Sequence, residues 1–376
     1  MNNLKIEKAI LVGVKLRKGA STDFASSLEE LKSLTEAAGG EVIATLVQVQ
    51  DRPNAATYIG KGKVEELNHL AAELQPDLVI FDSELTPVQL RNLEQAVDVR
   101  VIDRTMLILD IFGQRARSRE GLLQVELATL EYRLPRLTGK GAEMSRLGGG
   151  IGTRGAGEQK LELDRRRIRS RIRDLKRQME KLETTRRLHR KRRQRVGVKT
   201  VSLVGYTNAG KSSLFNMICQ GSHRSGKKQV EAGERLFQTL DTTTRKIVLP
   251  SGQEVLITDT VGFIQNLPHH LVAAFRATLE EAVDADLLLH IVDVADANHI
   301  DKTRVVERVL VELGADPEKI ITVFNKADLI ESPPAGEKNV LFVSAHTGMG
   351  IEQLLERIAG RLDERKNRMD SAPGEE

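Results

Sequence analysis

A glycine-containing octapeptide constrains this chain more than any other feature. Residues 205–212 read Gly-Tyr-Thr-Asn-Ala-Gly-Lys-Ser, the pattern G-x-x-x-x-G-K-S. A β-branched run, 200–204, precedes it, and a helix-like apolar run, 213–219, follows it. In a strand–loop–helix context, the glycines permit a tight turn, and backbone N–H groups and the helix N-terminus then face an anion. The octapeptide therefore predicts an α/β fold with a phosphate-binding loop.

Two residues of this loop have roles set by their chemistry. Lys211 is expected to reach the terminal phosphates of a nucleotide, and the Ser212 hydroxyl to bind Mg²⁺, a hard ion that prefers oxygen ligands. The residues predicted to contact the nucleotide here are Gly205, Tyr206, Thr207, Asn208, Ala209, Gly210, Lys211, Ser212 and Ser213.

Two further segments fit the γ-phosphate side of the same site. A switch segment contains Phe237, Gln238, Thr239, Leu240 and Asp241, and either Thr239 or Thr243 could bind Mg²⁺ there. The segment Asp259, Thr260, Val261, Gly262 follows a predicted strand and reads D-x-x-G. Asp259 is expected to hold Mg²⁺ through water, and the Gly262 amide to meet the γ-phosphate. The predicted metal set is Ser212, Thr239 and Asp259.

The base is predicted to be guanine. Asn325, Lys326, Ala327 and Asp328 read N-K-x-D after an apolar strand. The Asp328 carboxylate can accept from the two N–H donors of guanine that adenine lacks. Asn325 would brace the loops, Lys326 would lie along the base, and Ser344, Ala345 and His346 would add a backbone contact to the guanine oxygen. GTP and GDP with Mg²⁺ are therefore the expected ligands.

Phe263 follows Gly262, where many GTPases have a water-orienting glutamine. A phenylalanine ring cannot orient water. The catalytic set, Lys211, Gly262 and Phe263, therefore predicts slow unassisted hydrolysis.

The rest of the composition limits the class of protein. With 376 residues, 40% of them apolar, the chain can form two or three globular domains. Its single cysteine, Cys219, allows no intrachain disulfide, and no apolar run is long enough to span a bilayer. The charged N-terminus does not resemble a signal peptide. A cytoplasmic monomer is expected.

Residues 9–103 alternate predicted strands with predicted helices, which favours a small parallel α/β sheet. The strands are expected at 9–14, 41–50, 78–82 and 99–103, and the helices at 24–38, 64–74 and 86–96.

A long helical hairpin is predicted next. Leucines at 123, 127, 130, 134 and 137 alternate spacings of four and three, and residues 168, 172, 175, 179 and 182 do the same. Such spacing is typical of a coiled-coil seam. The connecting loop, 138–157, is rich in glycine, so the two helices should pack antiparallel with this loop at their tip.

The second helix of the hairpin is strongly basic. Residues 161–198 contain sixteen Lys and Arg but five Asp and Glu, a net charge of +11 in a chain whose total is +4. Like charges three and four residues apart destabilise an isolated helix. A polyphosphate partner would relieve that repulsion, so contact with the backbone of a nucleic acid is expected. Aromatic residues make up only 3% of the chain, so base stacking is not expected to dominate.

Together these motifs resemble the HflX family of ribosome-associated GTPases. The resemblance covers nearly the whole chain and includes the phosphate loop and the segments 58–66, 81–87, 114–121, 124–128, 148–155, 259–263 and 267–275. It implies a factor that binds the large ribosomal subunit and its rRNA through helix 161–198 and loop 148–157. It also implies that the factor splits or rescues ribosomes under stress, with ribosome-stimulated hydrolysis, and it favours Thr239 as the switch threonine.

The resemblance also implies a division into four parts. These are an N-terminal α/β domain, 1–112, a helical hairpin, 113–198, a GTPase domain, 199–363, and a charged tail, 364–376. The chain departs from the family pattern at 155–162, where Gly-Ala-Gly-Glu-Gln-Lys-Leu-Glu replaces the usual Gly-Pro-Gly-Glu-Thr-Gln-Leu-Glu. Ser213 replaces a usual threonine, and only a charged tail is expected after about residue 363, where some family members carry an extra domain. Two alternatives remain open, a ribosome assembly or dormancy factor and an ATP-driven RNA-remodelling enzyme.

Overall fold

The computed structural model describes residues 6–17, 21–137, 156–221, 237, 242–264, 282–331 and 340–371. They form two compact units, one with the described residues up to Leu182 and one with the described residues from Glu183 onward. This division falls inside a long helix, whereas the predicted boundary at 198 follows the end of that helix.

The first unit contains a four-stranded parallel sheet. Its strands are β1 (Lys8–Leu16), β2 (Glu41–Gln50), β3 (Leu78–Phe81) and β4 (Arg100–Asp103), in the order β2-β1-β3-β4. Helices α2 (Lys61–Leu74) and α3 (Pro87–Val97) cover one face, and α1 (Ser21–Ala37) and α4 (Arg104–Arg115) cover the other. The parallel α/β sheet predicted for this segment is confirmed, but α4 was not predicted.

Local chemistry explains the helix starts in this unit. Thr86 caps α3 by accepting from the Gln89 amide, while the Gln89 side chain accepts from the Thr86 amide, and Pro87 occupies the first turn. Asp103 caps α4 by accepting from the Met106 amide at 2.9 Å. Each cap satisfies backbone donors that a helix leaves open at its N-terminus.

A buried ionic cluster joins three elements of the first unit. Arg104, at the start of α4, is 1% exposed and donates to Asp82 at 2.8 Å and to Glu30 at 2.7 Å. Ser27 of α1 donates to the other oxygen of Asp82 at 2.7 Å. Removing one partner from such a buried cluster would leave an uncompensated charge, so the cluster fixes α1 and α4 against the end of β3.

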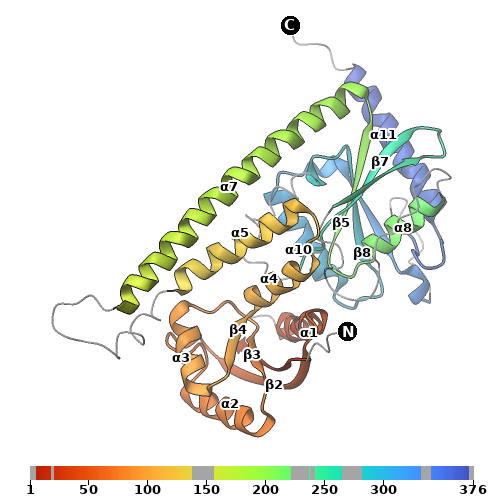
Figure 1. The fold of residues 1–376 in the computed structure, drawn as a ribbon. Helices are drawn as coiled ribbons and strands as arrows, with labels where there is room; N and C mark the ends of the chain where they lie inside the picture. Colours follow the sequence, from red (N-terminus) through yellow and green to blue (C-terminus); the bar gives the residue numbers. More distant parts are fainter. Residues whose placement is uncertain are drawn as a thin grey trace. The chain divides into compact units, whose positions relative to one another are not determined.

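The helical hairpin consists of α5 (Arg119–Arg136) and α7 (Ala156–Val196), which run antiparallel (Figure 1). The predicted seam is confirmed, because Leu123 and Leu127 pack on Ile172 and Leu175, and the other seam residues lie around them. Leu137 is the exception: it is the C-cap of α5 and lines a cavity with α3 and β4. Glu126–Arg171 and Glu131–Lys176 ion pairs flank the seam at 2.7 and 2.8 Å.

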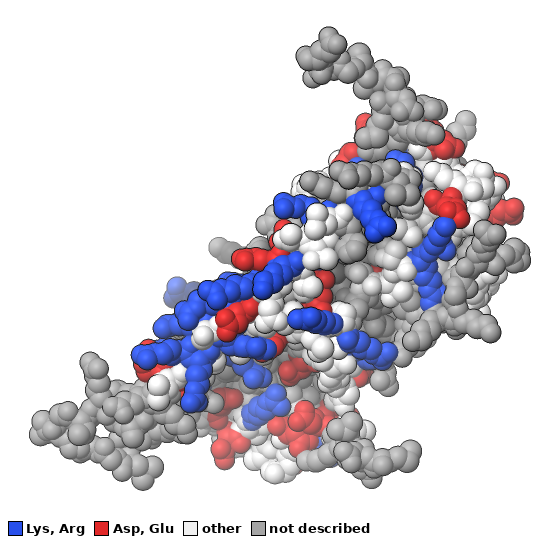
Figure 2. Space-filling model, turned by 45° about the horizontal axis from the view of Figure 1, so that its top comes forward, with Lys and Arg blue, Asp and Glu red and all other residues white. Residues whose placement is uncertain are grey.

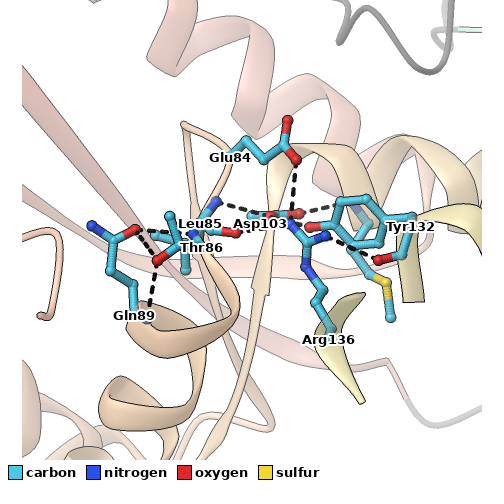
Figure 3. A network of polar contacts seen from close by, with 8 residues as sticks. Glu84, Leu85, Thr86, Gln89, Asp103, Tyr132 and Arg136 are labelled. Atoms are coloured by element: carbon cyan, nitrogen blue, oxygen red, sulfur yellow. Dashed lines mark hydrogen bonds and ion pairs between the residues drawn. The ribbon is translucent and has the colours of Figure 1, made fainter. Parts of the chain in front are cut away.

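Asp103 joins the sheet to the hairpin (Figure 3). Its Oδ2 accepts from the Leu85 amide at 3.0 Å and from the Tyr132 hydroxyl of α5. Arg136 lies over the Tyr132 ring, 3.3 Å from its centroid, and donates to the Leu85 carbonyl at 2.8 Å. Burial and the nearby Asp103 carboxylate raise the pKa of Tyr132. The end of α5 is therefore held to the carboxyl end of β4.

The second unit contains a six-stranded sheet in the order β10-β9-β8-β5-β7-β6, in which β6 alone is antiparallel to its neighbour among the described strands. The strands are β5 (Lys199–Gly205), β6 (Thr243–Val248), β7 (Glu254–Asp259), β8 (Leu287–Asp293), β9 (Ile320–Asn325) and β10 (Leu341–Phe342).

Helices α8 (Lys211–Gly221) and α11 (Ile351–Ser371) pack on one face of this sheet, and α10 (His299–Glu312) packs on the other. Short 3-10 turns lie at Pro317–Lys319 and Ala327–Leu329. Cys219 is buried in the core beneath α8. The charged tail predicted from 364 is not a separate segment up to Ser371, because α11 continues through it.

Candidate nucleotide site

Four motifs lie along one edge of the six-stranded sheet. The strands β5, β7 and β9 end at Gly205, Asp259 and Asn325, and Ser344 follows the end of β10. These strands are parallel, so their carboxyl ends meet at one edge, where open α/β sheets bind ligands. The structure therefore gathers segments that are up to 139 positions apart in the sequence.

The backbone of the phosphate loop requires its glycines. Gly210 has φ +85°, and an added Cβ would lie 2.2 Å from Asn325 Nδ2. Gly205 has φ +153°, and an added Cβ would lie 2.3 Å from the Ile291 carbonyl oxygen. A side chain at Gly205 would displace the backbone of β8, and a side chain at Gly210 would displace the buried Asn325 amide.

Lys211 is held inside the loop. Its side chain is buried, and its Nζ donates to the carbonyls of Gly205 at 3.1 Å and Tyr206 at 2.8 Å. An ammonium group has three donors, so one remains for an anion. Burial lowers the pKa of Lys211 to about 8, partly opposed by the Asp259 carboxylate. A bound phosphate would favour the charged form, because it adds negative charge to that of Asp259.

Ser212 and Asp259 offer a site for a hard cation. The Ser212 hydroxyl donates to Asp259 Oδ2 at 2.7 Å, and Asp259 is fully buried. Within the described ranges no cluster of three or more His, Cys, Asp or Glu side chains could hold a metal by itself. One hydroxyl and one carboxylate do fit Mg²⁺, which keeps several waters and takes its other ligands from phosphates.

Gly262 lies against both the loop and its lysine. A Cβ added there would lie 2.8 Å from Thr207 Cα and 2.9 Å from Lys211 Nζ. Two backbone bonds hold this approach, from the Thr207 amide to the Phe263 carbonyl at 2.7 Å and from the Phe263 amide to the Gly205 carbonyl at 3.1 Å. Thr260, in the same segment, donates to the Leu203 carbonyl at 2.5 Å.

The Phe263 ring is only 3% exposed and belongs to the core cluster with Tyr206, Val306 and Leu310. Its side chain therefore serves packing, while its backbone holds the D-x-x-G segment to the phosphate loop. The neighbouring Val261 is buried as well.

Asn325 connects the phosphate loop to the loop after β10. The side chain is 1% exposed, donates to the Ala209 carbonyl at 2.9 Å and accepts from the Ala345 amide at 3.1 Å. These two bonds connect the loops in the way expected of a bracing residue. Ser344 organises the second loop, since its Oγ accepts from the amides of His346 at 3.2 Å and Thr347 at 3.0 Å.

The remaining residues of the N-K-x-D segment differ in exposure. Lys326 has φ +62° and pairs with Asp293 at 2.6 Å, a partner at the end of β8 that sequence reasoning missed. Asp328 is exposed, and Ala327 is buried beneath it. Asn208 is also exposed, with φ +61°, and Ser213 is half-buried in the first turn of α8.

The switch segment is described only in part. Phe237 is buried with φ +54°, whereas Gln238, Thr239, Leu240 and Asp241 lie outside the described residues. Thr243 begins β6 and pairs in register with Asp259. The competition between Thr239 and Thr243 therefore stays open.

His290 is a buried residue near the site that sequence reasoning did not single out. It lies on β8 and is 1% exposed, and burial, together with the charge of Lys211, lowers its pKa to about 4. The only signal in the sequence was a histidine within the apolar run 287–292.

The order of these motifs along the sheet edge defines a GTPase domain of the phosphate-loop class. Profiles of three families match the chain: "GTP-binding GTPase N-terminal" over residues 25–113, "GTP-binding GTPase Middle Region" over 115–193, and "50S ribosome-binding GTPase" over 200–326.

Curated relatives extend this match to nearly the whole chain. GTPase HflX of Caldanaerobacter subterraneus subsp. tengcongensis is 52% identical over 95% of this chain and 81% of its own length. GTPase HflX of Escherichia coli K12 is 42% identical over 95% and 83%. The crystal structure of the SsGBP–GDP complex is 23% identical in sequence and matches 95% of this chain and 99% of its own chain, with a TM-score of 0.52. At this identity the match shows a similar fold.

The chain belongs to the HflX family of GTPases. It binds and hydrolyses GTP, and its family is generally ribosome-associated. None of the described helices has the length and apolar composition needed to cross a membrane.

Proposed function

We propose that this GTPase binds the large ribosomal subunit and splits or rescues stalled or inactive ribosomes, with hydrolysis stimulated by the ribosome. The observation that carries the proposal is a set of arginines on α7. Arg166, Arg169 and Arg173 are exposed and form no ion pair among the described residues. Their spacing of three and four puts them on one face of the helix.

This arginine face is distinct from the packed face of α7. Ile172 and Leu175 point into the seam, and Arg171 and Lys176 flank it in ion pairs with α5. At 100° per residue, Arg166 and Arg173 lie about 140–160° around the helix from the middle of the seam, and Arg169 lies about 100° from it. Figure 2 shows the blue Lys and Arg side chains gathered in a line along the hairpin. Such a line of charge suits a phosphate backbone, here that of rRNA, with loop 148–157 as a further contact.

The nucleotide site supports a switch that controls this contact. Lys211 would bind the β- and γ-phosphates, Ser212 and Asp259 would hold Mg²⁺ with Thr239, and Gly262 would sense the γ-phosphate. Asp328 would select guanine, and loss of the γ-phosphate would release the switch segments. A ribosomal partner would place this action in the cytoplasm.

Two features of the proposal concern rate and organisation. Because the Phe263 ring lies in the core, we expect intrinsic hydrolysis on the order of 10⁻³ s⁻¹ or below, as for unassisted GTPases. We also propose the functional division into an α/β domain, 1–112, a hairpin, 113–198, and a GTPase domain from 199, with the protein acting as a monomer.

The contact with rRNA is tested by salt dependence. The logarithm of the binding constant should fall linearly with the logarithm of the salt concentration, and each lost phosphate contact should reduce the slope by about 0.9. Arg169→Gln should therefore lower the slope for large-subunit binding by about one. The matched control, Arg308→Gln, changes an exposed arginine on α10 and should not. Equal slopes for both variants would show that α7 does not contact the RNA.

Splitting is tested by light scattering of intact ribosomes mixed with the protein and GTP or a non-hydrolysable analogue. Falling scatter supports splitting. Stable complexes without dissociation would instead favour an assembly or dormancy factor. The GTPase rate should rise with large subunits, and deletion of 148–157 should reduce that rise.

A further inference from the structure

Thr207, in the phosphate loop, carries a buried hydroxyl. The residue is 6% exposed, and its Oγ1 has no hydrogen-bond partner among the described residues. A buried hydroxyl without a partner destabilises a fold, and a valine of the same shape would avoid that penalty. The hydroxyl is therefore available to a bound ligand.

The position of Thr207 indicates where that partner binds. Thr207 Cα and the Thr207 methyl carbon Cγ2, both 2.8 Å away, and Lys211 Nζ, 2.9 Å away, surround the point where a Cβ on Gly262 would stand. The hydroxyl is bonded to the same Cβ as this methyl group, so a rotation about χ1 brings it to the same side. Thr207 is thus beside the lysine amino group that meets the terminal phosphates and the glycine that meets the γ-phosphate.

The backbone fixes Thr207 in this place. Its amide donates to the Phe263 carbonyl at 2.7 Å, so the loop cannot rotate the residue away without breaking that bond. At the same time the Phe263 ring is buried in the core, so the D-x-x-G segment offers no polar side chain at the position where many GTPases have glutamine.

We propose that the Thr207 hydroxyl donates a hydrogen bond to the γ-phosphoryl group of GTP and is a further catalytic residue of the hydrolysis. The oxygen of a water molecule forms the new bond to the γ-phosphorus, and the water gives up a proton to a γ-phosphoryl oxygen. The bond from phosphorus to the bridging oxygen breaks, and its electron pair stays on the leaving GDP. The threonine proton stays on Oγ1 throughout. A donor already in place stabilises the charge on the γ-phosphoryl oxygens without reorganisation. This inference rests on the proposed nucleotide site.

The test replaces only the hydroxyl. In Thr207→Val, kcat/KM for GTP should fall about 10- to 100-fold, the range for a hydrogen bond to a charged group. GDP lacks the γ-phosphate and so loses no contact in this variant, and its Kd should change less than about twofold. Thr207→Ser keeps the hydroxyl and should retain most of the activity.

A matched control is available within the chain. Thr105 on α4 is 0% exposed, and its hydroxyl also has no partner among the described residues. Thr105→Val makes the same chemical change away from the site, so both rate and GDP affinity should stay at the wild-type values. Neither valine variant should lower the melting temperature, because neither removes a hydrogen bond from the folded protein.

Three results would overturn the proposal: an unchanged kcat/KM in Thr207→Val, an equal loss in Thr207→Ser, or a parallel loss of GDP affinity. The second would show that the shape of the side chain matters and not its hydroxyl, and the third would show that the hydroxyl does not act on the γ-phosphate alone. Failure of the nucleotide site itself is distinguished by Lys211→Ala. If that variant binds GDP and GTP as the wild type does, the site has been placed wrongly.

Discussion

Asn325 provides the sharpest test of how the nucleotide site is assembled. Its amide group makes two bonds at the sheet edge, to the Ala209 carbonyl at 2.9 Å and from the Ala345 amide at 3.1 Å. The strands that carry these two loops, β5 and β10, are separated by β8 and β9 in the sheet. A single side chain thus sets the spacing between the predicted phosphate loop and the predicted base loop.

The size of the effect follows from burial. In Asn325→Ala, two backbone groups beside a side chain that is 1% exposed lose their partner. Each orphaned buried group costs about 1–3 kcal/mol, and water entering the new cavity would offset part of it, so we expect a loss of about 2–4 kcal/mol. Both GDP and GTP should bind at least about tenfold more weakly, ~1.4 kcal/mol, because binding must then order the loops.

Asn325→Asp separates the two bonds. It keeps an acceptor for the Ala345 amide but places an oxygen against the Ala209 carbonyl, so it should be at least as damaging as alanine. The matched control is Asn298→Ala, at the start of α10, where the asparagine makes no side-chain capping bond. That control should stay within about 0.5 kcal/mol of the wild type.

The assay is urea unfolding followed by circular dichroism, with and without GDP, together with titration of a fluorescent guanine nucleotide. The transition that GDP shifts to higher urea belongs to the nucleotide-binding unit. If Asn325→Ala unfolds and binds nucleotide like Asn298→Ala, the brace contributes nothing and the reasoning from the two bonds is refuted.

Three further predictions concern the same unit. Gly262→Ala places a methyl group under 3 Å from Thr207 and Lys211, and relieving this steric overlap costs about 1–3 kcal/mol. The kcat/KM for GTP should therefore fall about tenfold or more. The control Gly360→Ala adds a methyl group in open space on α11 and should leave kcat/KM unchanged. Folding lowers the pKa of His290 from 6.5 to about 4, so between these pH values the unfolded chain binds more protons than the folded protein. The free energy of unfolding should therefore drop by up to about 3 kcal/mol as the pH falls from 6.5 to 4. His290→Leu should show a correspondingly weaker dependence in urea unfolding at pH 7 and 4.5, and parallel profiles would contradict this. Burial lowers the pKa of Lys211 to about 8. Above that pH, GDP binding must be accompanied by protonation of Lys211, so GDP affinity should fall by up to about tenfold for each further pH unit. A GDP affinity that stays constant from pH 7.5 to 9.5 would refute this.

Elements with local periodicity could be predicted from the sequence. The seam residues of α5 and α7, such as Leu127 and Leu175, repeat at spacings that hold only if both segments are helical and face each other. Thr86 and Pro87 likewise marked the start of α3. The sheet orders could not be predicted in this way, because the pairing of β1 with β3 depends on which helices cover each face rather than on any residue of either strand.

Helix α4 was missed for a physical reason. It begins directly after β4, and Asp103 is both the last residue of that strand and the cap of the helix, so no loop separates the two. Leu107, Ile108, Leu109 and Ile111 are all buried, because α4 packs on α1, the sheet and α5. A helix covered from several sides has no polar face, and its apolar run cannot be distinguished from a strand by periodicity alone.

The nucleotide site shows the same limit at the scale of single side chains. Motif spacing predicts the backbone that approaches the phosphates, because Gly205 and Gly210 adopt conformations and close contacts that no other residue allows. It does not predict which neighbouring side chain faces them. That choice depends on the bond between the Thr207 amide and the Phe263 carbonyl, which joins segments 56 positions apart and leaves the phenylalanine in the core and the threonine beside Lys211. A GTPase without the glutamine can therefore present a different hydrogen-bonding side chain to the γ-phosphate, and only the contacts between its motifs reveal which one.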